Sequence, residues 1–129
     1  MTIEKFEDLE VWKESRMLCI RIFQITSSGG FNQDLRFKFQ IRNASGSIMD
    51  NIAEGFGRGG NKEFINFLSI AKGSNEEVRS QLYRASDFGY ISEEQCNEIL
   101  EMAEILSRRI SALMQYLKSS SMKGSKFKA

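Results

Sequence analysis

The chain of 129 residues contains no histidine and no proline, and it has only two cysteines. The lack of histidine excludes most catalytic triads and zinc sites, because histidine is the usual general base and metal ligand near neutral pH. The lack of proline removes the strongest helix breaker, so that every segment is free to form a helix. Cys19 and Cys96 are too few for a disulfide framework and lie at apolar helical positions, which predicts buried, reduced thiols.

Long apolar runs are also missing. No window approaches the ~20 apolar residues that a membrane-spanning helix requires. The N-terminus carries Glu4, Glu7 and Asp8 in place of the basic region of a signal peptide, so we expect a cytoplasmic protein without a membrane partner. A net charge of +1 and a hydrophobic content of 41% are ordinary for one globular domain.

The charges are unevenly distributed along the chain. All 17 acidic residues precede Ile105. The segment 105–129 carries only basic charges, at Arg108, Arg109, Lys118, Lys123, Lys126 and Lys128. We therefore predict a folded domain over residues 1–118, followed by a basic, disordered tail over residues 119–129.

Apolar residues recur at helical spacing in four successive segments. The first runs from Asp8 to about Thr26. The second begins near Asn32, a candidate N-cap, and ends at the glycines after Phe56. The third begins at Asn61, also a candidate N-cap, and runs to about residue 88. The fourth covers about 92–117.

The ends of the last two predicted helices have distinct signals. Gly89 is suited to the left-handed position that stops the third helix. Ser92 and Gln95 match a capping box at the start of the fourth. Short connections make successive helices antiparallel neighbours, which predicts an all-α, up-down-up-down four-helix bundle.

A hairpin about Gly59 would place residues whose numbers sum to about 118 side by side on the second and third helices. Small residues then face each other and allow a close approach of the two backbones, namely Ala44, Gly46 and Ser47 opposite Ala71, Gly73 and Ser74. The same pairing brings Asn51 and Glu54 near two phenylalanines. Because an unpartnered buried carboxylate is costly, we predict that Glu54 either bonds the loop amides of 57–61 or reaches another subunit.

The glycine-rich run 55–60 contains Arg58 and precedes Lys62, which allows two interpretations. It could cradle a phosphate at a helix N-terminus, although it lacks the ending of a P-loop and follows a helix instead of a strand. The alternative is a tight interhelical turn in which Gly55 and Gly57 have structural roles beside Asn51 and Glu54.

The sequence contains no clear motif for a metal site or an enzyme active site. Carboxylate pairs such as Glu94 with Glu98 could hold a metal inside a bundle, but the Glu-x-x-His motif of di-iron sites is absent. A solvated face explains these carboxylates better, and we expect no catalytic residue, no metal and no cofactor.

Basic side chains offer possible phosphate contacts in three segments. They are Arg36, Lys38 and Arg42 in the second helix, Arg58 and Lys62 at the turn, and Arg108 and Arg109 in the fourth helix. The alternative is a solvated surface without function. A ring of identical subunits would repeat even a modest basic patch, and the electrostatic fields of the repeated patches would add together.

Apolar residues on conflicting helix faces suggest assembly. Phe37 and Phe39 point to nearly opposite faces of one helix, so both cannot enter the same core. Ile65 likewise cannot share a core face with Phe64 and Leu68, nor can Tyr83 share one with Leu82. We predict that these four residues contribute to a subunit interface. The alternative is a monomer with a few exposed apolar side chains.

Several ordered motifs carry a family resemblance. They are the opening Phe6-Glu7-Asp8-Leu9-Glu10-Val11-Trp12-Lys13, Asn51-Ile52-Ala53-Glu54-Gly55 with Gly57 and Arg58, Glu63-Phe64 with Phe67-Leu68, and Ala71-Lys72-Gly73-Ser74 followed by Glu76-Glu77. From about Phe6 to Leu117 the chain resembles the bacterial four-helix-bundle family of 23S rRNA intervening-sequence proteins.

The resemblance implies a homopentameric ring, similar to the accessory variability determinant of diversity-generating retroelements. That protein has a basic surface that binds nucleic acid, and it contacts a reverse transcriptase. The resemblance implies no enzymatic activity. The leading hypothesis is therefore a non-catalytic oligomeric scaffold that binds structured RNA or other nucleic acid, and the alternative is a protein-interaction module without nucleic-acid contact.

Overall fold

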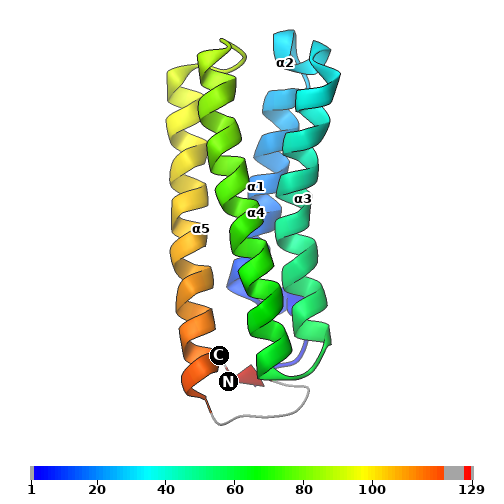
Figure 1. Cartoon of the computed structure of the whole chain (residues 1–129), viewed down its shortest axis with the longest axis vertical. Helices are drawn as coiled ribbons and strands as arrows, with labels where there is room; N and C mark the ends of the chain where they lie inside the picture. The colour runs from blue at the N-terminus through cyan, green and yellow to red at the C-terminus, as the bar shows by residue number, and fades with distance from the viewer. Residues whose placement is uncertain (1, 121–126, 129) are drawn as a thin grey trace.

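The computed structural model describes residues 2–120 and 127–128. Four long helices run alternately up and down (Figure 1): α1 (Glu10–Thr26), α3 (Leu35–Gly57), α4 (Asn61–Asp87) and α5 (Glu93–Ser119). A 3-10 turn, η1 (Phe6–Asp8), precedes α1, and a short helix, α2 (Gly29–Gln33), precedes α3. The predicted all-α antiparallel bundle is confirmed.

The two ends of the chain meet at one end of the bundle. A two-residue strand β1 (Thr2–Ile3) pairs antiparallel with β2 (Phe127–Lys128). The predicted disordered tail begins at residue 119, but α5 includes Ser119. Most of the tail, 121–126 and 129, lies outside the described residues. Among the helices described, none is long and apolar enough to cross a membrane.

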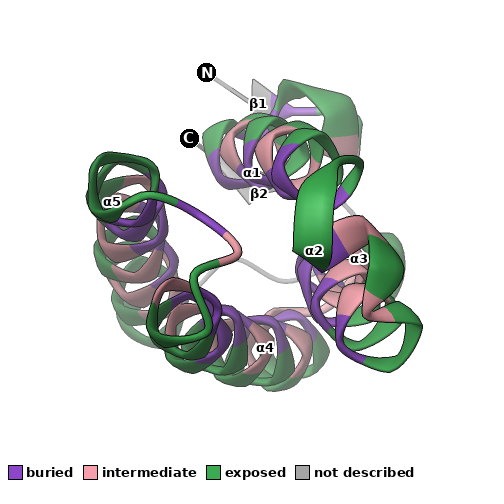
Figure 2. Ribbon diagram, turned by 90° about the horizontal axis from the view of Figure 1, so that it is seen from above, coloured by how far each residue is buried: buried purple, intermediate pink, exposed green. Residues whose placement is uncertain are grey.

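Each long helix packs against two others, and Figure 2 shows that its buried residues face the inside of the bundle. The neighbouring pairs are α1 with α3, α3 with α4, α4 with α5, and α5 with α1. The completely buried side chains come from all four helices, among them Leu18, Ile22, Ile41, Ile48, Ile52, Phe64, Leu68, Leu82, Ile99, Leu106 and Ile110. Burial of this apolar surface holds the helices together.

The ends of α4 and α5 follow the local sequence signals. Gly89 adopts φ 75° just after α4, as predicted for the left-handed stop position. The capping box is also confirmed, since Ser92 Oγ accepts from the Gln95 amide while Gln95 Oε1 accepts from the Ser92 amide. These caps satisfy amides that would otherwise lack partners at the start of α5.

Two other predicted caps are wrong. Asp34, and not Asn32, caps α3, because its Oδ1 accepts from the Phe37 amide at 3.2 Å. Asn32 lies within α2, a short helix that the apolar spacing does not predict. Asn61 is the first residue of α4 and is not its cap. Its side-chain Nδ2 instead donates to the Leu117 carbonyl at 3.1 Å, which joins the start of α4 to the end of α5.

The α3–α4 pair has the most extensive contact of the bundle, but two of the predicted small residues do not create it. Ser47 and Ser74 do face each other, with their hydroxyl oxygens 2.9 Å apart. At Gly46 and Gly73, however, an added Cβ would meet nothing within 4 Å. These two glycines therefore lie away from the helix contact.

The polar residues beside this contact form local bonds. Glu54 does not bond the loop amides as predicted, because its side chain is 54% exposed and pairs with Arg58. Its predicted contact with another subunit stays a prediction. Asn51 bonds within its own helix, with Nδ2 donating to the Ser47 carbonyl at 2.8 Å. The left-handed residue of the turn is Gly59, with φ 89°.

Candidate nucleic-acid interface

Three of the predicted cations, Arg36, Lys38 and Arg42, lie together in the N-terminal half of α3. Six residues of helix separate the first from the last, which corresponds to about 9 Å along the axis. Arg36 is exposed, whereas the other two are half-buried. The helix thus displays three positive charges over less than two turns.

Neutral groups hold two of these cations in place. Lys38 Nζ donates to Asn32 Oδ1 at 2.7 Å. Arg42 Nε donates to Thr26 Oγ1 at 2.8 Å, and its Nη2 donates to Ser27 Oγ at 3.1 Å. Over the part of the chain that the structure describes, none of the three cations forms an ion pair with a carboxylate. Their charge therefore remains available to an anionic ligand.

Two exposed phenyl rings lie beside these cations. The guanidinium carbon of Arg42 is 4.3 Å from the centroid of Phe23, and Lys38 Nζ is 5.7 Å from the centroid of Phe39. Phe23 is 59% exposed and Phe39 is 52% exposed. We call Arg36, Lys38, Arg42, Phe23 and Phe39 the α3 patch. Exposed aromatic rings beside cations suit single-stranded nucleic acid, whose bases stack on the rings.

Phe23 was not predicted as a functional residue, because it directly follows a residue of the apolar stripe of α1. It lies one position beyond Ile22, which is completely buried, so helical spacing alone does not show that Phe23 is exposed. Arg42 and Phe23 are distant in the sequence, so only the packing of α1 against α3 brings the ring under the guanidinium.

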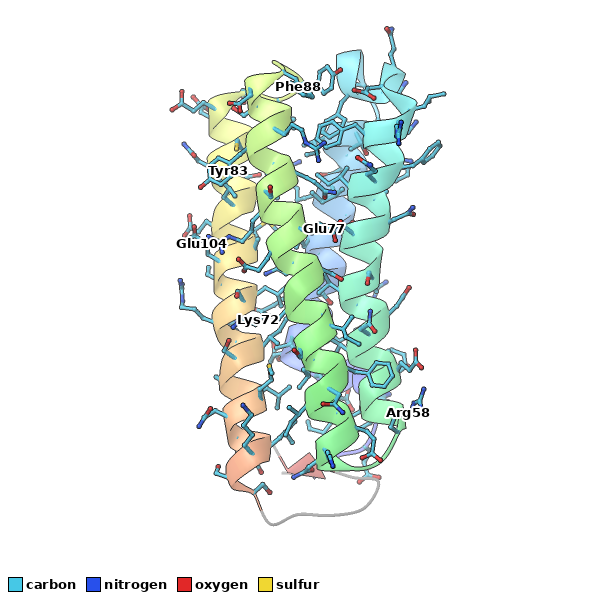
Figure 3. The ribbon with its side chains drawn as sticks, viewed as in Figure 1. Arg58, Lys72, Glu77, Tyr83, Phe88 and Glu104 are labelled. Atoms are coloured by element: carbon cyan, nitrogen blue, oxygen red, sulfur yellow. The ribbon has the colours of Figure 1, made fainter. Side chains whose placement is uncertain are left out.

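Arg58 and Lys62 lie at the opposite end of the bundle. Arg58 is 22 residues from Arg36, or about 33 Å along the helix axis. Figure 3 shows Arg58 at the other end from Phe88. Its Nη2 donates to Glu54 Oε2 at 2.7 Å, and its guanidinium carbon is 4.9 Å from the Phe67 centroid. These contacts give Arg58 a structural role and neutralise its charge, whereas Lys62 is exposed beside it.

Arg108 and Arg109 lie on α5, away from both other groups. Arg108 is exposed, but Arg109 forms an ion pair with Glu14 of α1. Burial raises the pKa of the Glu14 carboxyl, and the nearby Arg109 opposes this shift without reversing it. The seven predicted cations therefore fall into three separate groups. Within the described part of the chain, only the α3 group combines three cations that have no carboxylate partner.

The predicted interface residues are also dispersed. Phe37 is only 4% exposed and packs in the core, with its ring centroid 4.9 Å from that of Phe31, so it does not face outward. Phe39 takes the exposed side of α3 instead. Ile65 is half-buried against the core. Tyr83 is exposed and lies on α4, as Ile65 does, five turns further along that helix.

An exposed apolar surface that sequence reasoning did not identify lies between α1 and α5. Met17 and Ile20 of α1 are exposed, at 55% and 43%. Met17 lines a small groove of about 190 Å³ together with Met102 and Ile105 of α5 and with Glu14. Met17 and Ile20 are three residues apart and therefore share one face of the helix.

The described residues offer few side chains for metal binding or for thiol chemistry. Among the described residues, no group of three His, Cys, Asp or Glu side chains is arranged to hold a metal ion. Cys19 and Cys96 are free thiols whose hydrogen-bond acceptors are the carbonyls of Ser45 and Leu82. Burial raises the pKa of both thiols, which lowers their thiolate fraction.

Comparison with known proteins supports the resemblance. No curated protein matches the chain. A solved structure described as a protein of unknown function from the S23 ribosomal protein family, from Bacteroides thetaiotaomicron VPI-5482, superposes with a TM-score of 0.74 at 22% identity. The match covers 81% of this chain and 98% of the other, which shows a common fold. The sequence profile of the 23S rRNA-intervening sequence proteins matches residues 7–112. The chain therefore belongs to the 23S rRNA-intervening sequence protein family.

Proposed function

We propose that the chain is a non-catalytic, oligomeric scaffold of the cytoplasm that binds single-stranded segments of structured RNA through the α3 patch. The observation that carries the proposal is the set Arg36, Lys38 and Arg42, without carboxylate partners among the described residues and beside exposed Phe23 and Phe39. Phosphates would contact the cations and release counterions, while bases would stack on the rings.

The paired cations elsewhere support this choice of surface. Arg21, Arg58, Arg79 and Arg109 each form an ion pair with a glutamate of the same chain. A phosphate would have to compete with these carboxylates. At the α3 patch it would compete only with the neutral partners of Lys38 and Arg42. The proposed interface therefore excludes Arg58 and Arg109.

Assembly would strengthen binding by repeating the patch. We place the subunit contact at Met17 and Ile20, because exposed apolar side chains that share a face favour association. A symmetric ring would then present several α3 patches to one nucleic-acid molecule and raise its apparent affinity. The resemblance implies five subunits.

Two measurements test the proposal. A fluorescent single-stranded RNA titrated with the protein should bind at low ionic strength, and binding should weaken steeply as salt is added. Native mass spectrometry should find an oligomer that Met17→Glu converts to smaller species. If no salt-dependent binding occurs, the nucleic-acid role is rejected, and a monomeric wild-type protein would reject the scaffold.

The second candidate is a protein-interaction module without nucleic-acid contact, in which a partner such as a reverse transcriptase covers the exposed apolar side chains. The exposed Ile70 and Tyr83 of α4 favour it, because neither belongs to the α3 patch. Recovery of a stable protein partner after nuclease treatment, with loss of that partner in Tyr83→Ser, would favour this candidate.

A further inference from the structure

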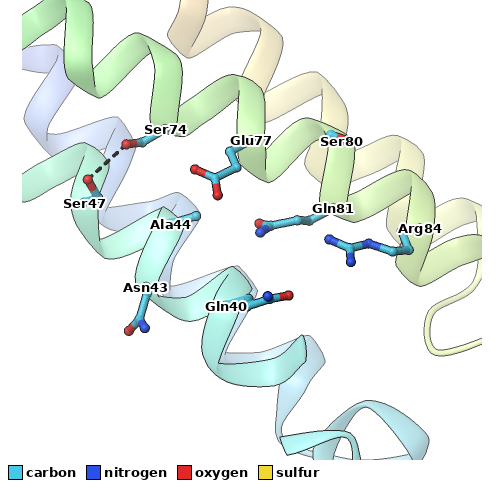
Figure 4. Close-up of a pocket in the computed structure, with 9 residues that line it drawn as sticks. All are labelled: Gln40, Asn43, Ala44, Ser47, Ser74, Glu77, Ser80, Gln81 and Arg84. Carbon is cyan, nitrogen blue, oxygen red and sulfur yellow. Dashed lines mark hydrogen bonds between the residues drawn. The ribbon is translucent and has the colours of Figure 1, made fainter. Parts of the chain in front are cut away.

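A polar groove runs between the upper halves of α3 and α4 and encloses about 460 Å³. Gln40 and Asn43 line it from α3, and Glu77, Gln81 and Arg84 line it from α4 (Figure 4). The hydrogen-bonded pair Ser47 and Ser74 closes one end. Small-molecule sites commonly enclose ~300–1,000 Å³, so the groove has room for a small polar group.

Gln81 contributes an unpartnered polar atom to this groove. Its side chain is directed from α4 toward α3, and the residue is only 4% exposed. Its Oε1 atom is buried and has no hydrogen-bond partner among the described residues. Buried polar atoms in folded proteins nearly always have partners, so an unpartnered amide oxygen that lines a groove indicates a missing donor.

Arg84 supplies a flat, charged surface at the other end of the groove. Its guanidinium carbon is 4.4 Å from the centroid of Phe37, which fixes the guanidinium against the buried ring. Arg84 also lines an adjoining hollow of about 350 Å³ with Arg36 and the exposed Phe88. This hollow joins the groove to the α3 patch, because Arg84 lines both the groove and the hollow, and Arg36 belongs to both the hollow and the patch.

We propose that the α3–α4 groove holds one unstacked base of the single-stranded RNA bound at the α3 patch, and the inference therefore rests on the proposed function. The base stacks on the Arg84 guanidinium, as unpaired bases commonly do in RNA complexes. Gln81 Oε1 accepts a hydrogen bond from the base edge, and its NH₂ group donates another. The phosphates on either side contact Arg36 and its neighbours.

Glu77 gives the groove a base preference. An ionised carboxylate only accepts hydrogen bonds, so it favours a base that carries an exocyclic amino group. Cytosine, adenine and guanine carry such a group, whereas uracil presents only carbonyl oxygens and one ring N–H on its pairing edge. The groove should therefore bind uracil least well.

The experiment compares oligocytidine and oligouridine of equal length at one salt concentration. Wild-type protein should prefer oligocytidine, and Gln81→Met should weaken the binding of oligocytidine by about fivefold or more, the size of one good side-chain contact to a base. Glu77→Gln should reduce discrimination against oligouridine, because an amide also donates. Gln115→Met, an exposed change on α5, is the matched control. Gln81→Met should fold, because methionine conserves volume and no described hydrogen bond of this side chain is lost.

A second measurement separates failure of the groove from failure of the patch. Cytidine alone should shift the side-chain amide resonance of Gln81 in the NMR spectrum of wild-type protein and of the doubly substituted Arg36→Gln, Arg42→Gln protein. If oligonucleotides fail to bind but cytidine shifts the resonance, the patch is wrong and the groove stands. If oligonucleotides bind without base preference and cytidine causes no shift, the groove proposal is overturned. A shift caused only by N-acetylalanine methylamide would also overturn it and would identify a peptide site.

Discussion

Gly55 of α3 lies directly against Phe67 of α4, so that a Cβ placed at Gly55 would be 2.6 Å from the Phe67 Cβ. Real Cβ atoms essentially never come this close, and the Phe67 Cβ cannot move away because it is attached directly to the backbone. This contact, and not the pair Gly46 and Gly73, is where the absence of a side chain brings the two helices together.

We predict that Gly55→Ala destabilises the protein by about 1–3 kcal/mol, because overpacking forces the helices apart. Gly46→Ala is the matched control on the same helix, since an added Cβ there meets nothing within 4 Å. It should stabilise the helix by about 0.5–1 kcal/mol. Urea unfolding followed by circular dichroism measures both. Equal effects of the two changes would contradict the assigned packing.

The capping box at the start of α5 gives a second prediction. Ser92→Ala removes the acceptor of the Gln95 amide hydrogen bond. The expected loss is about 1 kcal/mol, typical of a serine N-cap. Ser80→Ala, an exposed change within α4, serves as control and should have little effect on the midpoint of urea unfolding. An unchanged midpoint for Ser92→Ala would show that the cap contributes nothing.

The pKa of Glu14 predicts a pH-dependent effect. Burial raises this pKa from the ordinary value of 4.5, so the folded protein holds the proton more tightly than the unfolded chain does. Ionisation of Glu14 therefore weakens folding at neutral pH, and this penalty disappears as the pH falls through the raised pKa.

The substitution Glu14→Gln removes the ionisable group. We expect the variant to match or exceed wild-type stability at pH 7, and to lose any advantage below pH 4.5, the ordinary carboxyl pKa. Unfolding free energies from urea titrations at both values provide the comparison. A variant that is clearly weaker at pH 7 would mean that attraction to Arg109 exceeds the effect of burial.

The thiols should react slowly in the folded protein. The pKa of Cys19 and of Cys96 is raised from 9.0, mainly by burial, so little thiolate exists at pH 8. We predict slow iodoacetamide labelling in buffer and rapid labelling in urea, with Cys96 the slower of the two because it is buried and Cys19 is half-buried. Mass spectrometry of single Cys→Ala variants assigns each rate. Rapid labelling of native Cys96 would contradict its burial.

The parts of the fold that depend on local sequence were predictable. The capping box of Ser92 and Gln95 and the stop at Gly89 need only neighbouring residues, and both were identified. The start of α3 was not identified, because Asn32 and Asp34 are both residue types that favour the N-cap. The packing of Phe31 in the core decides between the two positions.

The candidate site was only partly predictable, because contacts between residues distant in the sequence determine which side chains are exposed and unpaired. Helical periodicity shows that Phe37 and Phe39 face apart but does not say which one is buried. The pairing of Arg109 with Glu14 spans 95 residues, so sequence alone gives no sign that this cation is neutralised. The groove at Gln81 likewise is lined by residues of both α3 and α4, so neither helix alone predicts it.

The salt dependence of RNA binding tests the central proposal most directly. Wild-type protein is compared with the triple variant Arg36→Gln, Lys38→Gln, Arg42→Gln and with a charge-matched control, Arg58→Gln, Lys62→Gln, Arg108→Gln. Because each phosphate contact to single-stranded RNA adds about 0.7 to the slope of log K against log salt, the patch variant should lose about two units of slope per bound patch. The control should keep the wild-type slope. Equal slopes for the two variants would contradict the assignment of RNA binding to the α3 patch.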